Sequence, residues 1–152
     1  MEKLVQFSIF LANKPGVLSG IYRELAKAKI NVTGIAMMDS MEHGVLRLMV
    51  ENPVGARSLF KQLSVPVTET DVLGVTLANR PGAAADLCDR LADAHIPIGY
   101  MYCTTGARGG KTTAVIKVPD IKKAIKVLEN SRDKRRDMKI KLRRPTPNNH
   151  RR

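Results

Sequence analysis

Hydrophobic and polar residues alternate at the start of the chain. Every second residue from 5 to 11 is apolar, and Gln6 and Ser8 lie between them on the opposite face, which is the period of a half-buried β-strand. From Leu18 to Ala28, apolar residues recur at spacings of 3, 4 and 3, which is the period of an amphipathic helix. The pattern therefore predicts a strand over residues 4–11, followed by a helix.

The rest of the chain continues in this order. Similar patterns predict strands over residues 32–38 and 44–50, a helix that begins at Asn52-Pro53, and a short fourth strand that ends near Thr70. They then predict a second series, with a strand over 72–78, a helix over 82–94, strands over 98–103 and 111–118, and a helix over 120–129. Met138–Leu142 also alternates, beyond a charged run, and is the candidate for the fourth strand of this second series.

Each series has the order βαββαβ, which predicts an α+β fold of two ferredoxin-like units in tandem. In this arrangement an antiparallel sheet carries both helices on one face. The other face is bare and the sheet edges are free, so we expect sheet-to-sheet packing or edge pairing between copies.

The two series are copies of one another. Asn13-Lys14-Pro15-Gly16 recurs as Asn79-Arg80-Pro81-Gly82, 66 residues later. A long period that occurs twice predicts two small domains rather than a solenoid, which needs three or more units. We therefore expect one domain over residues 1–70, a second over 71–130 that reaches 142 if the last strand forms, and a tail over 131–152.

The net charge of +12 is concentrated at the end of the chain. Residues 130–152 hold 10 of the 26 Lys and Arg residues and only two Asp residues, a net charge of +8. The basic character therefore belongs mainly to the tail, which we expect to be flexible, and not to the repeated body.

Composition also limits the compartment and the class of protein. Cys88 and Cys103 form no CxxC pair, and no charged and apolar leader or apolar run of 18 residues is present. We expect a cytoplasmic protein that does not enter a membrane. The three histidines are scattered without metal-ligand spacing, and Tyr100 and Tyr102, which share a strand face, are expected to pack in a core or interface.

The repeated turn between strand and helix has a definite chemistry. The Asn side chain is expected to cap the helix, Pro fixes φ, and Gly removes a side chain where the first amides of the helix are exposed. Free amides and the positive end of the helix dipole favour an anionic group such as a carboxylate. A well-formed helix start without a ligand is the alternative that these residues leave open.

Two stretches of the chain resemble the ACT domain, a small regulatory module that senses amino acids. They read FLANKPGVLSGIYRELAKAKINVTGIAMM and LANRPGAAADLCDRLADAHIPIGYMYC. The resemblance covers roughly residues 3–129 and implies an effector site between two ACT domains, at the first strand-to-helix turn and the facing second strand, with a free amino acid as ligand. The ligand contacts that it implies are Asn13, Pro15, Gly16, Val17, Leu18, Asn31, Val32 and Thr33 in the first copy, and Asn79, Pro81, Gly82, Ala83, Ala84, Pro97, Ile98 and Gly99 in the second.

The second copy departs from the family pattern. Pro97 replaces the counterpart of Asn31, and Ala83-Ala84 replaces Val17-Leu18. Proline lacks an N–H, and smaller side chains change the pocket wall. We therefore expect unequal sites, with the first copy, through Asn13 and Gly16, as the better one.

The sequence favours a regulatory homodimer, with an enzyme or another protein as its regulated partner. No carboxylate pair and no nucleophile beside a base are evident, so we expect no catalytic activity and no cofactor. The alternative is a nucleic-acid-associated protein that attaches weakly and nonspecifically through the basic tail. Sequence-specific RNA readout is disfavoured, because the predicted third strands GVLRLMV and KTTAVIKV carry no aromatic residue on which a base stacks.

Overall fold

The structure is a computed structural model that describes the chain except for residues 13, 39–42, 105–110 and 131–152. Its elements are β1 (Glu2–Ala12), α1 (Val17–Lys27), β2 (Val32–Met38), β3 (His43–Val50), α2 (Pro53–Gln62), β4 (Val67–Ala78), α3 (Ala83–Asp93), β5 (Tyr100–Cys103), β6 (Lys111–Lys117) and α4 (Ile121–Asn130). The predicted βαββαβ order is confirmed through α4, and the candidate strand Met138–Leu142 lies outside the described residues.

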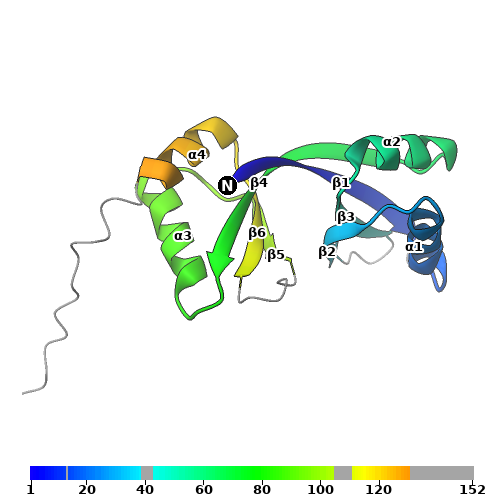
Figure 1. Ribbon diagram of the computed structural model, residues 1–152, viewed down its shortest axis with the longest axis horizontal. Helices are drawn as coiled ribbons and strands as arrows, with labels where there is room; N and C mark the ends of the chain where they lie inside the picture. The colour runs from blue at the N-terminus through cyan, green and yellow to red at the C-terminus, as the bar shows by residue number, and fades with distance from the viewer. Residues whose placement is uncertain (13, 39–42, 105–110, 131–152) are drawn as a thin grey trace, which may run out of the picture.

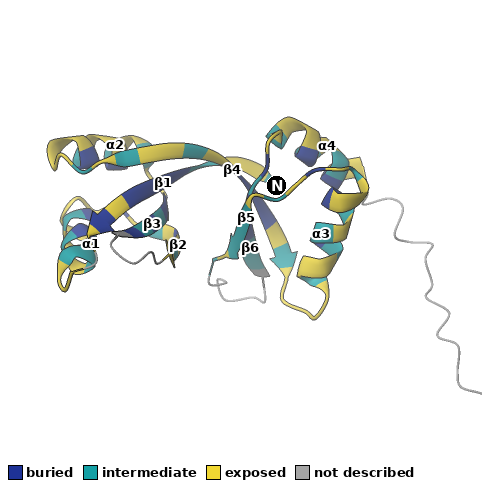
Figure 2. Cartoon of the chain, turned by 180° about the vertical axis from the view of Figure 1, so that it is seen from behind, coloured by how far each residue is buried: buried dark blue, intermediate teal, exposed yellow. Residues whose placement is uncertain are grey.

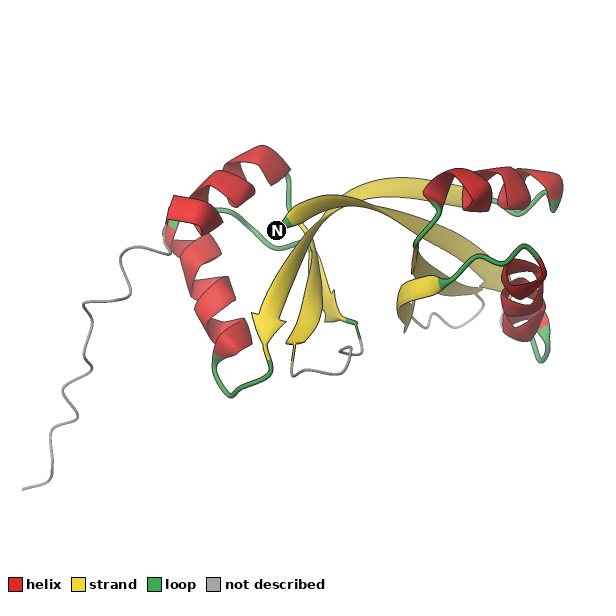
Figure 3. Cartoon of the chain, viewed as in Figure 1, coloured by secondary structure: helices red, strands yellow, loops and turns green. Residues whose placement is uncertain are grey.

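All six strands form one antiparallel sheet with the order β2-β3-β1-β4-β6-β5. The sheet bends into an arch, which β1 and β4 cross at the top (Figure 1). The helices lie on the outside of the arch, with α1 and α2 over one limb and α3 and α4 over the other (Figure 3). We call these limbs unit 1 (β1, α1, β2, β3, α2 and the first part of β4) and unit 2 (the second part of β4, α3, β5, β6 and α4).

The two units share strand β4. Its first part, Val67–Gly74, pairs with β1, and its second part, Leu73–Ala78, pairs with β6. The prediction of two separate strands here was wrong, because the residues between Thr70 and Val72 include no Gly or Pro to turn the chain. The boundary predicted between residues 70 and 71 falls inside this strand.

Each unit has its own hydrophobic core between sheet and helices. In unit 1 the rings of Phe7 on β1 and Phe60 on α2 meet edge to face at 5.5 Å, a favourable geometry for aromatic pairs. In unit 2, Leu73 and Ile116 on paired strands pack against Leu91 and Leu128 of the two helices. Figure 2 shows the resulting pattern, with buried positions on the sides of the helices that face the sheet.

The inner face of the arch forms a third cluster. Met49, Val72 and Val115 are buried there, with Leu4, Tyr100 and Tyr102 packed against them. These residues come from the faces of both units that carry no helix. The sheet-to-sheet packing expected for the bare faces therefore occurs within a single chain.

Candidate functional site

The two strand-to-helix turns have the same backbone geometry. In the first turn, the amide of Lys14 donates to the carbonyl of Ala12 at 2.8 Å, and the amide of Val17 donates to the carbonyl of Lys14 at 3.3 Å. The equivalent bonds of the second turn measure 2.9 and 3.3 Å. The repeated sequence therefore encodes a repeated structure.

Glycine, and not asparagine, immediately precedes each helix. Gly16 has φ 88° before α1, Gly82 has φ 83° before α3, and neither helix has a side-chain cap. The predicted cap by Asn79 is therefore wrong, and the second helix begins after Pro81. The left-handed conformation explains why glycine is used, since a Cβ atom is strained there. Asn13 lies outside the described residues.

The first turn of α1 is suited to an anion. The first helical amides have no intrahelical acceptor and carry the positive end of the dipole. α1 has no acidic residue in its first turn, and Lys14 and Pro15 beside it are exposed. Val17 and Leu18 are half-buried against the core of unit 1, so their backbone is held by packing.

The second turn differs because its charge is neutralised within the chain. Arg80 forms an ion pair of 2.8 Å with Asp86, which lies in the first turn of α3, and also donates to the carbonyl of Pro81. The residue equivalent to Asp86 in the first copy is Gly20. An anion would meet an acidic residue at α3 but not at α1.

The start of the second strand contributes polar groups in unit 1. The side-chain amide of Asn31 donates to the Glu51 carboxylate at 2.8 Å. Val32 packs against the core. Thr33 lines a cavity of about 300 Å³ on the inner side of the arch, together with Glu51 and Thr104.

The corresponding region of unit 2 is apolar. Exposed Pro97 and half-buried Ile98 line a shallow recess of about 460 Å³ beside Cys88 of α3. The residue equivalent to Cys88 in the first copy is Tyr22, whose larger side chain packs against the core of unit 1. Gly99 is exposed and donates its amide to the carbonyl of Lys117 at 2.9 Å.

Within each unit, the turn and the start of the second strand lie at opposite ends of the sheet. In unit 1, Ala12 before the turn pairs with His43 at one end of β3, whereas Val32 pairs with Val50 at the other. The two turns also lie at the two ends of the arch (Figure 1). The structure therefore gathers none of the predicted turn residues with predicted second-strand residues inside one chain.

Gln6 is a buried polar residue that the alternation pattern did not distinguish from a solvent-facing one. Its side chain is fully buried, donates to the hydroxyl oxygens of Ser8 at 3.1 Å and Tyr100 at 2.9 Å, and accepts a hydrogen bond from Tyr102 at 3.0 Å. The Arg47 guanidinium lies 3.6 Å from the ring centroid of Tyr100. This network joins the two units, and it confirms the packing role predicted for the two tyrosines.

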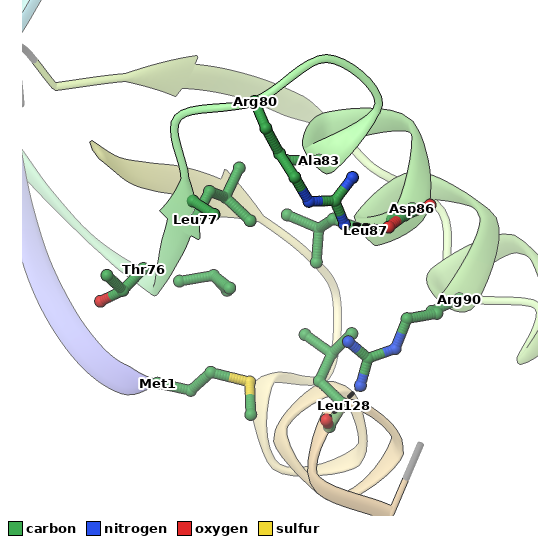
Figure 4. Close-up of a pocket in the computed structure, with 11 residues that line it drawn as sticks. Met1, Thr76, Leu77, Arg80, Ala83, Asp86, Leu87, Arg90 and Leu128 are labelled. Carbon is green, nitrogen blue, oxygen red and sulfur yellow. Dashed lines mark hydrogen bonds and ion pairs between the residues drawn. The ribbon is translucent and has the colours of Figure 1, made fainter. Parts of the chain in front are cut away.

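A further cavity of about 190 Å³ lies beside the second turn, between the end of β4 and the helices of unit 2. Figure 4 shows Arg80 and Arg90 near its rim, with Leu77 and Leu128 at its walls and Met1 on the opposite side. Ala83 lines this cavity, whereas Ala84 is exposed. Arg90 donates to the carbonyl of Leu128.

Neither metal chemistry nor a membrane span is indicated by the described part of the chain. Among those residues, no group of three or more His, Cys, Asp and Glu side chains is placed to hold a metal ion. None of the described helices is both long and apolar enough to cross a bilayer. Cys88 and Cys103 are free thiols.

Comparison with known proteins gives a consistent picture. Residues 2–136 match the family model of an ACT domain pair. The fold is similar to that of protein BT0572 from Bacteroides thetaiotaomicron, with 33% identity, a TM-score of 0.79, and coverage of 86% of this chain and 89% of that one. It is also similar to the regulatory subunit of aspartate kinase from Thermus thermophilus, with 14% identity, a TM-score of 0.61, and coverage of 87% and 96%. No curated protein matches the chain significantly.

Proposed function

The chain belongs to the ACT family as a pair of ACT domains, and from that premise we propose that it is a noncatalytic regulatory module that binds a free amino acid. A regulatory role is supported by the fold shared with regulatory subunits of aspartate kinase from two Thermus species. The two free thiols fit a reducing compartment, and we place the protein in the cytoplasm.

The start of α1 is the observation that carries this proposal. The turn at Gly16 presents first-turn amides and the positive helix end to solvent, with Lys14 exposed beside it. The α-carboxylate of an amino acid is the group that such a turn accepts. We favour the first copy because Asp86 already neutralises Arg80 in the second.

A second copy of the chain completes this proposed site. An amino acid also needs an acceptor for its ammonium group, and Asn31 holds the carboxylate of Glu51 at the far end of unit 1. The turn and this pair lie at opposite ends of β3, so they meet across two chains. We therefore propose a homodimer whose effector lies between the turn of one copy and a second-strand start of the other, at Asn31–Thr33 or Pro97–Gly99.

The regulatory consequence follows from where the ligand would lie. A ligand that contacts two copies at once binds the assembled state in preference to the separate chains, so it shifts the assembly equilibrium by linkage. We propose that an enzyme or another protein recognises the assembled state and is regulated through it.

A thermal-shift screen of the twenty amino acids tests the proposal. Binding to the native state raises stability by RT ln(1 + [L]/Kd), which is about 2.7 kcal/mol at a ligand concentration of 100 Kd. The active ligand is then titrated against two variants that remove equivalent charges, Lys14→Gln and Arg80→Gln. Lys14→Gln should weaken binding by about tenfold, and Arg80→Gln should leave it nearly unchanged.

Two results would contradict the proposal. The absence of any shift with all twenty amino acids at millimolar concentration opposes amino-acid binding itself. A shift that Arg80→Gln removes and Lys14→Gln does not would move the site to the second copy. Light scattering with and without the ligand tests the homodimer separately.

A further inference from the structure

Strand β4 has an unoccupied edge in unit 2. On one side it pairs with β6 through Ala78. On the other side, its pairing with β1 stops at Gly74, opposite Glu2. Among the described residues, no strand pairs with this side of residues 75–78. An open strand edge is prone to pair with another strand, and proteins commonly cover it.

An apolar cavity adjoins this edge. The cavity of about 190 Å³ described above is lined by Val75 and Leu77 from the strand, Leu87 from α3 and Leu128 from α4. Figure 4 shows Leu77, Leu87 and Leu128 around the open space, with Met1 closing one side. The edge therefore offers backbone groups to a strand and an apolar recess to its side chains.

Unit 1 shows what covers the equivalent edge. Ile9 is the counterpart of Val75 at the offset of 66 residues, and Ile9 pairs with Val67 of β4. The chain reaches this position directly from α2, which ends at Gln62, and Val65 and Val67 pack against the core. In the first copy, the strand that follows the second helix fills the place that is open in the second.

The chain after α4 contains a segment suited to the same position. Met138, Ile140 and Leu142 alternate with Lys139 and Lys141, which is the pattern of a strand with one buried face. The described chain ends at Asn130, two residues beyond the Leu128 that lines the cavity. Residues 131–137 span about 23 Å when extended, at about 3.3 Å per residue, so the segment reaches the edge.

We propose that Met138–Leu142 pairs antiparallel with the free edge of β4 and fills the adjoining cavity with its apolar side chains. The segment lies end to end with β1 along the same side of β4. Its direction matches that of β4 against β1 in unit 1, and its lysines face the inner side of the arch. The cavity beside the second turn is then the seat of a strand rather than an effector pocket.

Hydrogen exchange of the full chain tests the proposal. The probe is the peptide that contains residues 75–78, compared among the full chain, a chain that ends at Arg143, a chain that ends at Asp137, and the variant Ile140→Asp. Protection should be equal in the full chain and in the chain that ends at Arg143. It should fall by about tenfold or more in the other two.

Controls separate this outcome from general unfolding and from pairing between chains. Exchange of the β3 peptide in unit 1 should be the same in all four proteins, which shows that each is folded. Equal exchange of residues 75–78 with and without Met138–Leu142 overturns the proposal. Protection that disappears on dilution into the monomer range also overturns it, because the strand would then come from a second copy.

Discussion

The side-chain amide of Gln6 donates a hydrogen bond of 2.9 Å to the hydroxyl oxygen of Tyr100, and this bond links the first strand of unit 1 to an edge strand of unit 2. Gln6 also accepts a hydrogen bond from Tyr102. The bare faces of the two sheets thus meet through a polar centre surrounded by the apolar side chains of Met49, Val72 and Val115. Such a centre is favourable only while every member has its partner.

Replacing Gln6 by leucine should destabilise the protein. Both tyrosine hydroxyls lose their partner in the inner face, and a buried polar group without a partner costs about 1–3 kcal/mol. Urea denaturation should show a lower midpoint for Gln6→Leu. Gln62→Ala, at an exposed position on α2, should stay within about 0.5 kcal/mol of the parent protein. A Gln6→Leu protein as stable as the parent would show that the network contributes nothing to the joint between units.

Alkaline pH should weaken the same joint. Burial chiefly raises the pKa of Tyr102 to about 12, with a further increase from Tyr100 that Arg47 opposes. In the unfolded chain, a tyrosine loses its proton near pH 10. The stabilisation is therefore complete below about pH 10 and is lost as the pH rises through about 12, because the unfolded state releases its proton first.

The measurement is the urea midpoint of the parent and of Tyr102→Phe between pH 8 and pH 11.5. The parent should lose stability more steeply above pH 10 than the variant, which has no phenol at this position. Comparison of the two proteins cancels the titration of lysines and cysteines that both contain. Parallel curves would show that Tyr102 titrates normally in the folded protein.

The turn glycines should tolerate alanine poorly. Gly16 has φ 88°, and the left-handed conformation costs a residue with a Cβ atom about 1–2 kcal/mol. Gly20 lies inside α1, where an added Cβ meets nothing within 4 Å, so Gly20→Ala should stabilise the helix by about 0.5–1 kcal/mol. Thermal unfolding of the two variants should give shifts of opposite sign. Shifts of the same sign would contradict the backbone geometry of the turn.

Much of the fold follows from local patterns, and its exceptions have physical causes. The strand over 32–38 was predicted with the bounds of β2, because alternation and turn residues define it locally. The fusion within β4 depends on pairing with β1 and β6, which are distant in sequence. The burial of Gln6 depends on the bend of the sheet, since a polar residue on a bare face looks the same whether water or another sheet covers it.

The candidate site was predictable as a turn but not as an electrostatic environment. The repeat identified both turns from their identical positions. Asparagine and proline suggested a capped helix start, but the conformation that both turns share depends on glycine at the position before the helix. The ion pair between Arg80 and Asp86 requires the side chains to fold back over the first turn of α3, which spacing alone does not indicate.

This difference between the copies gives a prediction that is specific to the proposed effector site. Gly20→Asp introduces into α1 the carboxylate that Asp86 provides in α3. It should weaken binding of the amino acid found in the thermal screen by about tenfold, because a carboxylate beside the turn repels that of the ligand and neutralises Lys14. Gly20→Ala is the control, since it changes the helix without adding charge, and it should bind as the parent does. Calorimetric titration of both variants at low salt measures the effect, which should decrease at high salt as charges are screened. Equal affinities for the two variants would show that the carboxylate of the ligand does not lie at the start of α1.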